Sequence, residues 1–386
     1  MMFVRMMMAV LSLVTAGLFM PLQAAEEGLV PSQTIRVLLL ENVPSAIVEA
    51  KGGYSLYNPK NGKNISIGGL FGKRYVAQPY GDGLKWGEIF PGLYQVVIHP
   101  DPQTTFLVNG IEYAGKLALF QVGDRITIVN EVDVDDYIKS TLAMQFDNSA
   151  SEEVMAAIVI AARTDACYLV QRAPNADYQV KAADVGYEGV GVTRRGNGVD
   201  RAVDSTRPLV MLRNDSLGHP YFAARWTEDC AGKTASYQVI YRKDGNTPDK
   251  VVESPIAAAH RADVSWAWSV SKSELARLLS MDKVTAVEPY VNAPSGKIYA
   301  VQIRSGATTK SVDFLAFQQA VGADNLKSSD FKISMKGDTV TFNGFGKGTG
   351  VGLCLYSAKA MAARGRSATQ ILTTFFPETK VSSIIY

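Results

Sequence analysis

The spacing of apolar and polar residues changes at about residue 130. Before that point, short apolar runs are separated by turn-forming sequences such as YGDG and HPDPQT. This pattern is typical of strands in a mixed or antiparallel sheet. The runs expected to form strands are 34–43, 93–99, 116–122 and 124–130. We therefore expect a β-rich N-terminal part over 26–130.

After residue 130 the apolar period becomes helical. A short helix is expected in 132–146, with Asp133, Asp135 and Asp136 in its acidic opening, and a longer one in 148–172. Ser149 and Glu152 have the spacing of a capping box at the start of the longer helix. Arg163 lies within that helix, and an unpaired buried guanidinium is very costly. Arg163 must therefore find acceptors in the core or point into a cleft.

The remainder of the chain, 131–386, mixes strands and helices without regular βαβ repetition. Such an order predicts an α+β fold with mixed β-sheets and interspersed helices. Further helices are expected at 271–280, 311–322, 353–365 and 367–376, and further strands at 297–305 and 338–345.

The first 25 residues are typical of a secretory signal peptide. Arg5 is followed by an apolar run over 6–20, and the small residues Ala24 and Ala25 precede two glutamates. A membrane anchor is the alternative, but the run of about 15 residues is shorter than the roughly 20 needed to span a bilayer. We predict an exported protein of the periplasm or cell envelope, with no membrane span after cleavage.

Composition narrows the remaining classes of function. The net charge is +2, so no general positive field favours nucleic acid. Three cysteines do not make a disulfide framework, and Cys167 is expected to be a buried thiol. His219 and Cys230 are the one metal-capable pair within a short span, and two ligands do not form a site. We expect neither a metal nor another cofactor.

The segment NGFGKGTGVG, 343–352, has glycine at every second position from Gly344. It matches neither the G-x-G-x-x-G dinucleotide fingerprint nor the Walker pattern, because Gly348 follows Lys347 where a hydroxyl residue is required. The alternative is a strand with one bare face, close to another backbone or a ligand. Such a face would suit a sugar chain or a packed helix.

Several segments, taken in order, carry a resemblance to a known family. The segments are VNEVDVDDYIKS with Asn130 and Tyr137, the helix ending Ala161-Ala162-Arg163-Thr164, CAGKT, NLKSSDFKI and FNGFGKGTGVG. The chain resembles the stage II sporulation protein D family, which includes amidase enhancers and septal glycan-cleaving enzymes. This resemblance implies an exported protein that acts on peptidoglycan, with glycan strands as its ligand and a cell-wall amidase as a candidate partner.

Active members of that family are similar to lytic transglycosylases, which cut peptide-stripped glycan with one catalytic glutamate. The family spacing, counted back from Arg163, places Gln145 at the position of that glutamate. An amide cannot donate an acidic proton, so the family reaction is not available to Gln145. Asp147 is a candidate for an acid displaced from the family position, and its alternative role is that of a turn residue. Glu152 is a second candidate, but a glutamate there is more typical of the negative charge that favours a helix N-terminus.

Two hypotheses therefore stand. The first is a glycan-binding protein in cell-wall remodelling or septation, and the second is an active transglycosylase with a displaced acid. Thr349 stands where the family has histidine in Gly-His-Gly. The expected substrate contacts are Tyr137, Arg163, Lys347, Thr349 and Tyr356, with core packing as the alternative for Arg163 and the two tyrosines.

Overall fold

The computed structural model describes residues 33–67, 73–146, 150–193, 196–214, 219–248 and 250–384. The expected signal peptide, Asp147 and Ser149 lie outside these residues. From Gln33 onward the chain forms one compact unit.

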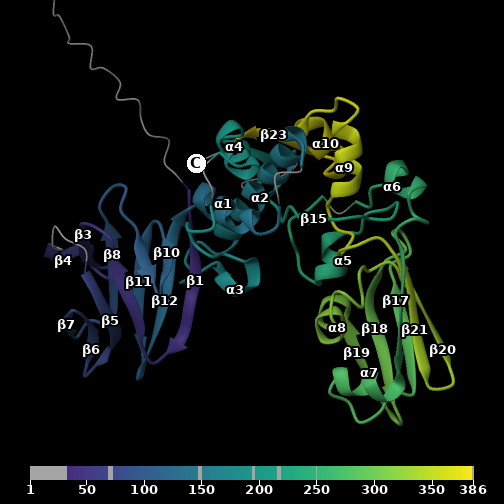
Figure 1. The fold of residues 1–386 in the computed structure, drawn as a ribbon, viewed down its shortest axis with the longest axis horizontal. Coiled ribbons are helices and arrows are strands. Elements are labelled where there is room, and N and C mark those ends of the chain that lie inside the picture. The colour runs from purple at the N-terminus through teal and green to yellow at the C-terminus, as the bar shows by residue number, and fades with distance from the viewer. Residues whose placement is uncertain are drawn as a thin grey trace, which may run out of the picture. The chain divides into compact units, whose positions relative to one another are not determined.

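Two sheets form the β-rich first part (Figure 1). All their strand pairs are antiparallel except β1 with β13, which is parallel, so the mixed-sheet expectation is confirmed. The seven-stranded sheet has the order β13 (Val180–Lys181), β1 (Thr34–Val43), β12 (Arg125–Asp133), β11 (Lys116–Val122), β8 (Gln95–Pro100), β3 (Tyr54–Asn58), β4 (Lys63–Ile67). The six-stranded sheet has the order β10 (Ile111–Tyr113), β9 (Phe106–Val108), β2 (Ala46–Ala50), β5 (Lys73–Tyr80), β6 (Gly83–Trp86), β7 (Glu88–Pro91).

Alternation along these strands builds their shared core. In β11, Leu117 and Leu119 are fully buried while their neighbours are partly exposed. They belong to one apolar cluster with Val48 and Phe106 of the other sheet. Since successive side chains of a strand point to opposite faces, the period of two in the sequence is the cause of this core.

The expected helices follow directly. Helix α1 (Val134–Ala143) begins at Asp133, whose side chain accepts a hydrogen bond from the backbone N–H of Asp135. Helix α2 (Glu152–Arg172) has Ser151 at its N-cap, without a side-chain cap hydrogen bond, so the prediction of Ser149 as the cap was wrong. The helix is buried along most of its length. It packs against α1, α4 (Gly198–Ser205), β14 (Leu209–Arg213), α9 (Leu355–Ala362) and α10 (Ala368–Phe375). The small side chains of its many alanines allow these elements to pack closely against α2.

Two three-stranded sheets carry the second core, around Phe314, Phe317 and Phe342. One contains β16 (Ser265–Ser271), β21 (Thr339–Phe345) and β20 (Phe331–Lys336), and the other β17 (Ala286–Val291), β18 (Ile298–Ser305) and β19 (Thr308–Asp313). The remaining elements are α3 (Ala182–Val185), β15 (Trp226–Thr227), α5 (Tyr237–Tyr241), α6 (Pro255–Ala259), α7 (Lys272–Leu278), α8 (Phe314–Val321), β22 (Leu353–Cys354) and β23 (Thr379–Ser383). The fold is α+β, as expected. None of the helices in the described ranges has the length and apolarity that a bilayer crossing requires.

The glycine segment corrects one expectation. Strand β21 ends at Phe345, and Gly346, Gly348, Gly350 and Gly352 all have positive φ, so the segment is not a flat strand. Gly346, Gly348 and Gly352 are needed because the 225–229 segment lies against them. A Cβ on Gly352 would lie 2.0 Å from the carbonyl oxygen of Arg225. The expectation of a close backbone was correct, whereas that of an open bare face was wrong.

Candidate functional site

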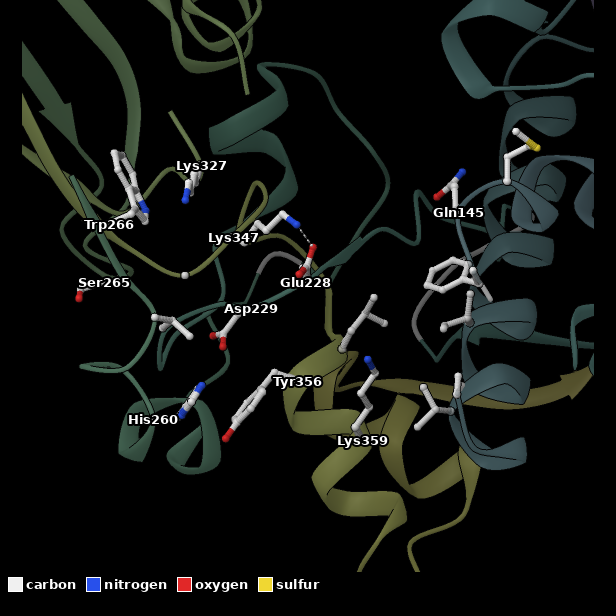
Figure 2. Close-up of a pocket in the computed structure, with 18 of the residues that line it drawn as sticks. Gln145, Glu228, Asp229, His260, Ser265, Trp266, Lys327, Lys347, Tyr356 and Lys359 are labelled. Atoms are coloured by element: carbon white, nitrogen blue, oxygen red, sulfur yellow. Dashed lines mark ion pairs between the residues drawn. The ribbon is translucent and has the colours of Figure 1, made fainter. Parts of the chain in front are cut away.

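A cleft of about 840 Å³ lies between the α1–α2 region and the segments around the glycine stretch (Figure 2). One wall comes from the end of α1, the loop after it and the first turns of α2. The other wall comes from the loop after β15, the segment from the end of α6 to the start of β16, the loop between α8 and β20, and the region from the glycine segment to α9. The lining residues are Ala143, Met144, Gln145, Phe146, Ala150, Val154, Ile158, Glu228, Asp229, His260, Val264, Ser265, Trp266, Lys327, Gly346, Lys347, Leu355, Tyr356 and Lys359.

Aromatic rings provide flat surfaces in this cleft. His260 and Tyr356 stack with ring centroids 4.3 Å apart and planes 8° from parallel. The backbone N–H of Tyr356 donates to the carbonyl of Glu228 at 3.0 Å, which fixes the start of α9 against the neighbouring loop. Trp266 is largely buried and its indole N–H donates to Ser328 Oγ at 3.2 Å. These rings are therefore held in place before any ligand arrives.

Charged side chains surround the rings. Lys347 Nζ lies 2.8 Å from Glu228 Oε2, and both side chains are more than half exposed. Because exposed ion pairs are weak, this pair can open for a ligand at little cost. Lys327 and Lys359 also line the cleft and are exposed. Neither lysine forms a salt bridge within the described part of the chain.

Asp229 differs from its neighbour Glu228 because it is buried. Its Oδ1 accepts a hydrogen bond from the backbone N–H of Ala231 at 2.7 Å. Its Oδ2 is buried and has no hydrogen-bond partner among the described residues. Two backbone hydrogen bonds to Lys347, both 3.0 Å, hold this residue beside the glycine segment. Because buried polar atoms are almost always hydrogen-bonded, this oxygen is a candidate contact for a ligand in the cleft.

Gln145 lies on the other wall of the cleft, at the exposed turn that follows α1 (Figure 2). Its side-chain amide donates to the carbonyl of Thr141 at 3.1 Å. The structure thus brings Gln145, Lys347 and Tyr356, three of the residues expected from the sequence, into one cleft.

Arg163 is in the core and away from the cleft. It is 1% exposed, and its Nε lies 2.8 Å from Asp135 Oδ1. Its other nitrogens donate to the backbone carbonyls of Val203, Thr206 and Leu209. The core alternative for Arg163 is the one that these contacts support.

Tyr137 and Thr349 also have structural contacts. Tyr137 is buried and packs on Tyr187 with ring centroids 5.8 Å apart, and burial raises the pKa of its phenol. Tyr187 in turn donates to Asn130 Oδ1 at 2.7 Å, so the Asn130 and Tyr137 motif maintains the core. The carbonyl of Thr349 accepts from Ser329 Oγ at 2.7 Å. Neither Tyr137 nor Thr349 lines the cleft.

The sequence reasoning missed most of the opposite wall, namely Glu228, Asp229, His260, Trp266, Lys327 and Lys359. They come from four separate segments, and only the tertiary fold brings them together. Lys359 carried one signal, since it lies one helical turn after Tyr356 and so shares its face. Within the described ranges, no three His, Cys, Asp or Glu residues are grouped as metal ligands.

Comparison with known proteins identifies the family of this chain. The family model described as stage II sporulation protein matches residues 122–212, which include α1, α2 and Gln145. The stage II sporulation protein D of Bacillus subtilis is 30% identical over 104 residues, covering 27% of this chain and 29% of that protein. The chain belongs to the stage II sporulation protein D-like family.

Other relatives extend the likeness beyond that region. An uncharacterised protein of Chlamydia pneumoniae is 37% identical over 182 residues, which is 46% of this chain and 65% of the relative. An uncharacterised protein of Brachyspira hyodysenteriae is 26% identical over 348 residues, 89% of this chain and 91% of the relative. The match thus spans about two thirds of the first relative's length and most of the second's. Family membership associates the chain with a sporulation- or cell-wall-related role.

Proposed function

We propose that this protein is exported and binds peptidoglycan glycan strands in its cleft during cell-wall remodelling or septation, with a cell-wall amidase as candidate partner. The observation that carries the proposal is the composition of the cleft. It combines the stacked His260–Tyr356 pair with exposed lysines and a polar wall. Gln145, at the family position of the catalytic glutamate, lines the same cleft. Sugar rings present apolar faces and hydroxyl edges, which such a surface can contact together.

The lysines indicate which form of glycan is bound. A muramic acid residue has a lactyl carboxylate that is amide-linked when a stem peptide is attached and ionised when the peptide has been removed. Lys327, Lys347 and Lys359 all line the cleft. Two of the three have no carboxylate partner among the described residues, and the third is paired only at the exposed surface. Peptide-stripped strands, with one free carboxylate on each muramic acid, therefore suit this cleft best.

The test is retention of peptide-stripped glycan strands by the purified protein. The double variant Lys327→Ala with Lys359→Ala is expected to lose about tenfold or more in affinity, since each lysine contributes about 1 kcal/mol to an exposed charge contact. Lys310→Ala is the matched control, because Lys310 is exposed on β19 and does not line the cleft. Tyr356→Ala tests the aromatic surface in the same assay, with the exposed Tyr94→Ala as its control.

Salt separates the charge contribution from the aromatic one. Raising the ionic strength should weaken binding by the wild type and hardly affect the residual binding by the double lysine variant. Equal affinity for stripped and peptide-bearing strands would contradict the role given to the lysines. Failure of the wild type to retain either form would refute the proposed function.

A second candidate function is cleavage of the strand, and Asp229 is the observation that favours it. The reaction needs one carboxylic acid, which protonates the glycosidic oxygen that leaves. The resulting carboxylate then takes the proton from the sugar's own hydroxyl as that oxygen closes the anhydro ring. Asp229 lies in the cleft with Oδ2 unpartnered within the described structure, whereas Glu228 beside it is paired with Lys347. Asp147, the displaced acid expected from the sequence, is outside the described residues.

Product analysis distinguishes binding from cleavage. If Asp229 is the acid, the wild type forms anhydro-ended products, Asp229→Asn loses them by at least 100-fold, and Glu228→Gln keeps most of the activity. Loss in Asp147→Asn instead would assign the acid to that residue. If the wild type is inactive and Gln145→Glu cuts the strand, the cleft binds the substrate in a productive position and lacks only its acid.

A further inference from the structure

Two of the three cysteines lie together, and each is next in the chain to a residue that lines the cleft. Cys230 follows Asp229, and Cys354 is the last residue of β22 and the N-cap of α9. Strands β15 and β22 pair in parallel, which brings the two segments side by side. Both cysteines are buried, at 1% and 0% exposure.

The contacts between these cysteines are direct. The backbone N–H of Cys230 donates to Cys354 Sγ at 3.4 Å, which places the two cysteines in contact. The neighbouring Cys230 side chain is the largest cause that lowers the pKa of the Cys354 thiol, and the Ser357 hydroxyl adds to it. The Cys354 side chain in turn raises the pKa of Cys230. Cys354 is thus the member of the pair whose thiolate is stabilised.

We propose that Cys230 and Cys354 form a reversible modification site, a dithiol that a disulfide-bearing oxidant converts into an intramolecular disulfide. The Cys354 thiolate attacks one sulfur of the oxidant, forms a mixed disulfide and releases the first thiolate of the oxidant. The Cys230 sulfur then gives up its proton, attacks the Cys354 sulfur and releases the second thiolate. Two protein thiols lose two electrons, the oxidant disulfide gains them, and the two protons end on its two thiols.

We expect the oxidant to approach the pair from the cleft. Asp229 and Leu355, the immediate neighbours of the two cysteines in the chain, both line it. The disulfide would tie the loop that carries Glu228 and Asp229 to the start of the helix that carries Tyr356. These are the residues already joined by the hydrogen bond from the Tyr356 N–H to the Glu228 carbonyl. Oxidation would therefore add a covalent cross-link between these two segments of the cleft wall.

The third cysteine provides an internal control. Cys167 is also fully buried, and its thiol donates to Gln33 Oε1 at 2.8 Å. Burial raises its pKa to about 12, so its thiolate is scarce at neutral pH. A buried thiol without a cysteine contact should stay reduced under conditions that oxidise the pair.

Peptide mapping tests the proposal on the purified, folded protein, and it does not depend on glycan binding. The protein is incubated at pH 7 with oxidised glutathione, alkylated in denaturant and digested without reductant. The expected result is one linked peptide, Cys230 to Cys354, a mass loss of about 2 Da, and alkylated Cys167. Dithiothreitol should reverse the loss. Because the link closes a long loop, the oxidised protein should melt roughly 3–6 °C higher than the reduced one.

Variants make the assignment specific. Cys354→Ser should abolish the linked peptide and the melting shift, while Cys167→Ser should leave both unchanged. Three freely alkylated cysteines in the wild type after prolonged oxidation would overturn the proposal, as would a link that includes Cys167. Should Cys354→Ser fail to fold, the wild-type map and Cys167→Ser still decide the outcome.

Discussion

Replacing Arg163 by methionine tests whether the family's arginine serves the core or the ligand. The change removes the guanidinium and keeps much of the side-chain volume. It leaves Asp135, which is 9% exposed, with Arg207 as its remaining ion-pair partner. It also removes a donor from the carbonyls of Val203 and Leu209, whereas the Thr206 carbonyl keeps the backbone N–H of Leu209.

The loss should be about 3–5 kcal/mol, the range found when one partner of a buried ion pair is removed. For a chain of this length that corresponds to a fall in melting temperature of roughly 4–7 °C. Arg207→Met is the matched control. Arg207 contacts the same carboxylate, but its side chain is 55% exposed, so its removal should cost only about 0–1 kcal/mol.

The assay is thermal unfolding followed by circular dichroism, combined with glycan retention measured well below the melting temperature. We expect Arg163→Met to melt early and, while folded, to retain glycan as the wild type does. A variant that melts like the wild type but loses glycan would refute the core assignment, because only a ligand contact would then explain the loss.

Two further predictions concern stability. Gly352→Ala should cost at least about 2 kcal/mol, because its Cβ would lie 2.0 Å from the Arg225 carbonyl oxygen, while Gly365→Ala, with almost the same φ and open space around it, should cost only about 1 kcal/mol. Equal falls in melting temperature in the two variants would show that backbone strain at positive φ, and not the contact with Arg225, determines the loss of stability in both. Burial raises the pKa of Asp330, but Arg261 and Lys297 outweigh it and hold that pKa below its ordinary value of 3.8. The ionised form is thus favoured by folding, so the stability difference between wild type and Asp330→Asn should be full above about pH 5 and shrink as the pH falls below 4. A difference that is unchanged at pH 3 in urea titrations would contradict this.

The order of strands and helices could be predicted because burial imposes a period on the sequence. Strand β11 alternates and α2 is apolar at helical spacing, so both were found from the pattern alone. The conformation of the glycine segment could not be found in this way. Alternating glycines have the same period as a strand. The segment 225–229, which lies against three of these positive-φ glycines, is remote from them in sequence.

The site was predictable on one wall only. Gln145 lies in a segment with a recognisable helix on each side, so a fixed spacing from Arg163 locates it. The opposite wall depends on which loop lies next to which, and no local pattern encodes that Asp229 pairs with Lys347. The role of Arg163 was undecidable for a related reason. Most of its acceptors are backbone carbonyls, which every residue has and which therefore give no sequence signal.

The glycine segment acts on the cleft through its backbone. A Cβ on Gly346 would lie 2.5 Å from the Asp229 carbonyl oxygen, and one on Gly348 would lie 2.5 Å from Thr227 Oγ1. Without side chains there, the 227–229 segment can approach, and the Lys347 backbone forms its two hydrogen bonds with Asp229. That pairing is what brings the side chains of Lys347 and Glu228 together in the cleft.

Thr227 strengthens the same contact. Its hydroxyl donates to the carbonyl of Lys347 at 3.0 Å and accepts from the N–H of Gly350 at 3.1 Å. Thr227 therefore holds the glycine segment in place through both of its hydroxyl contacts. Because the Thr227 hydroxyl supports this backbone pairing, the glycine segment keeps its place in the cleft wall with threonine rather than histidine at position 349.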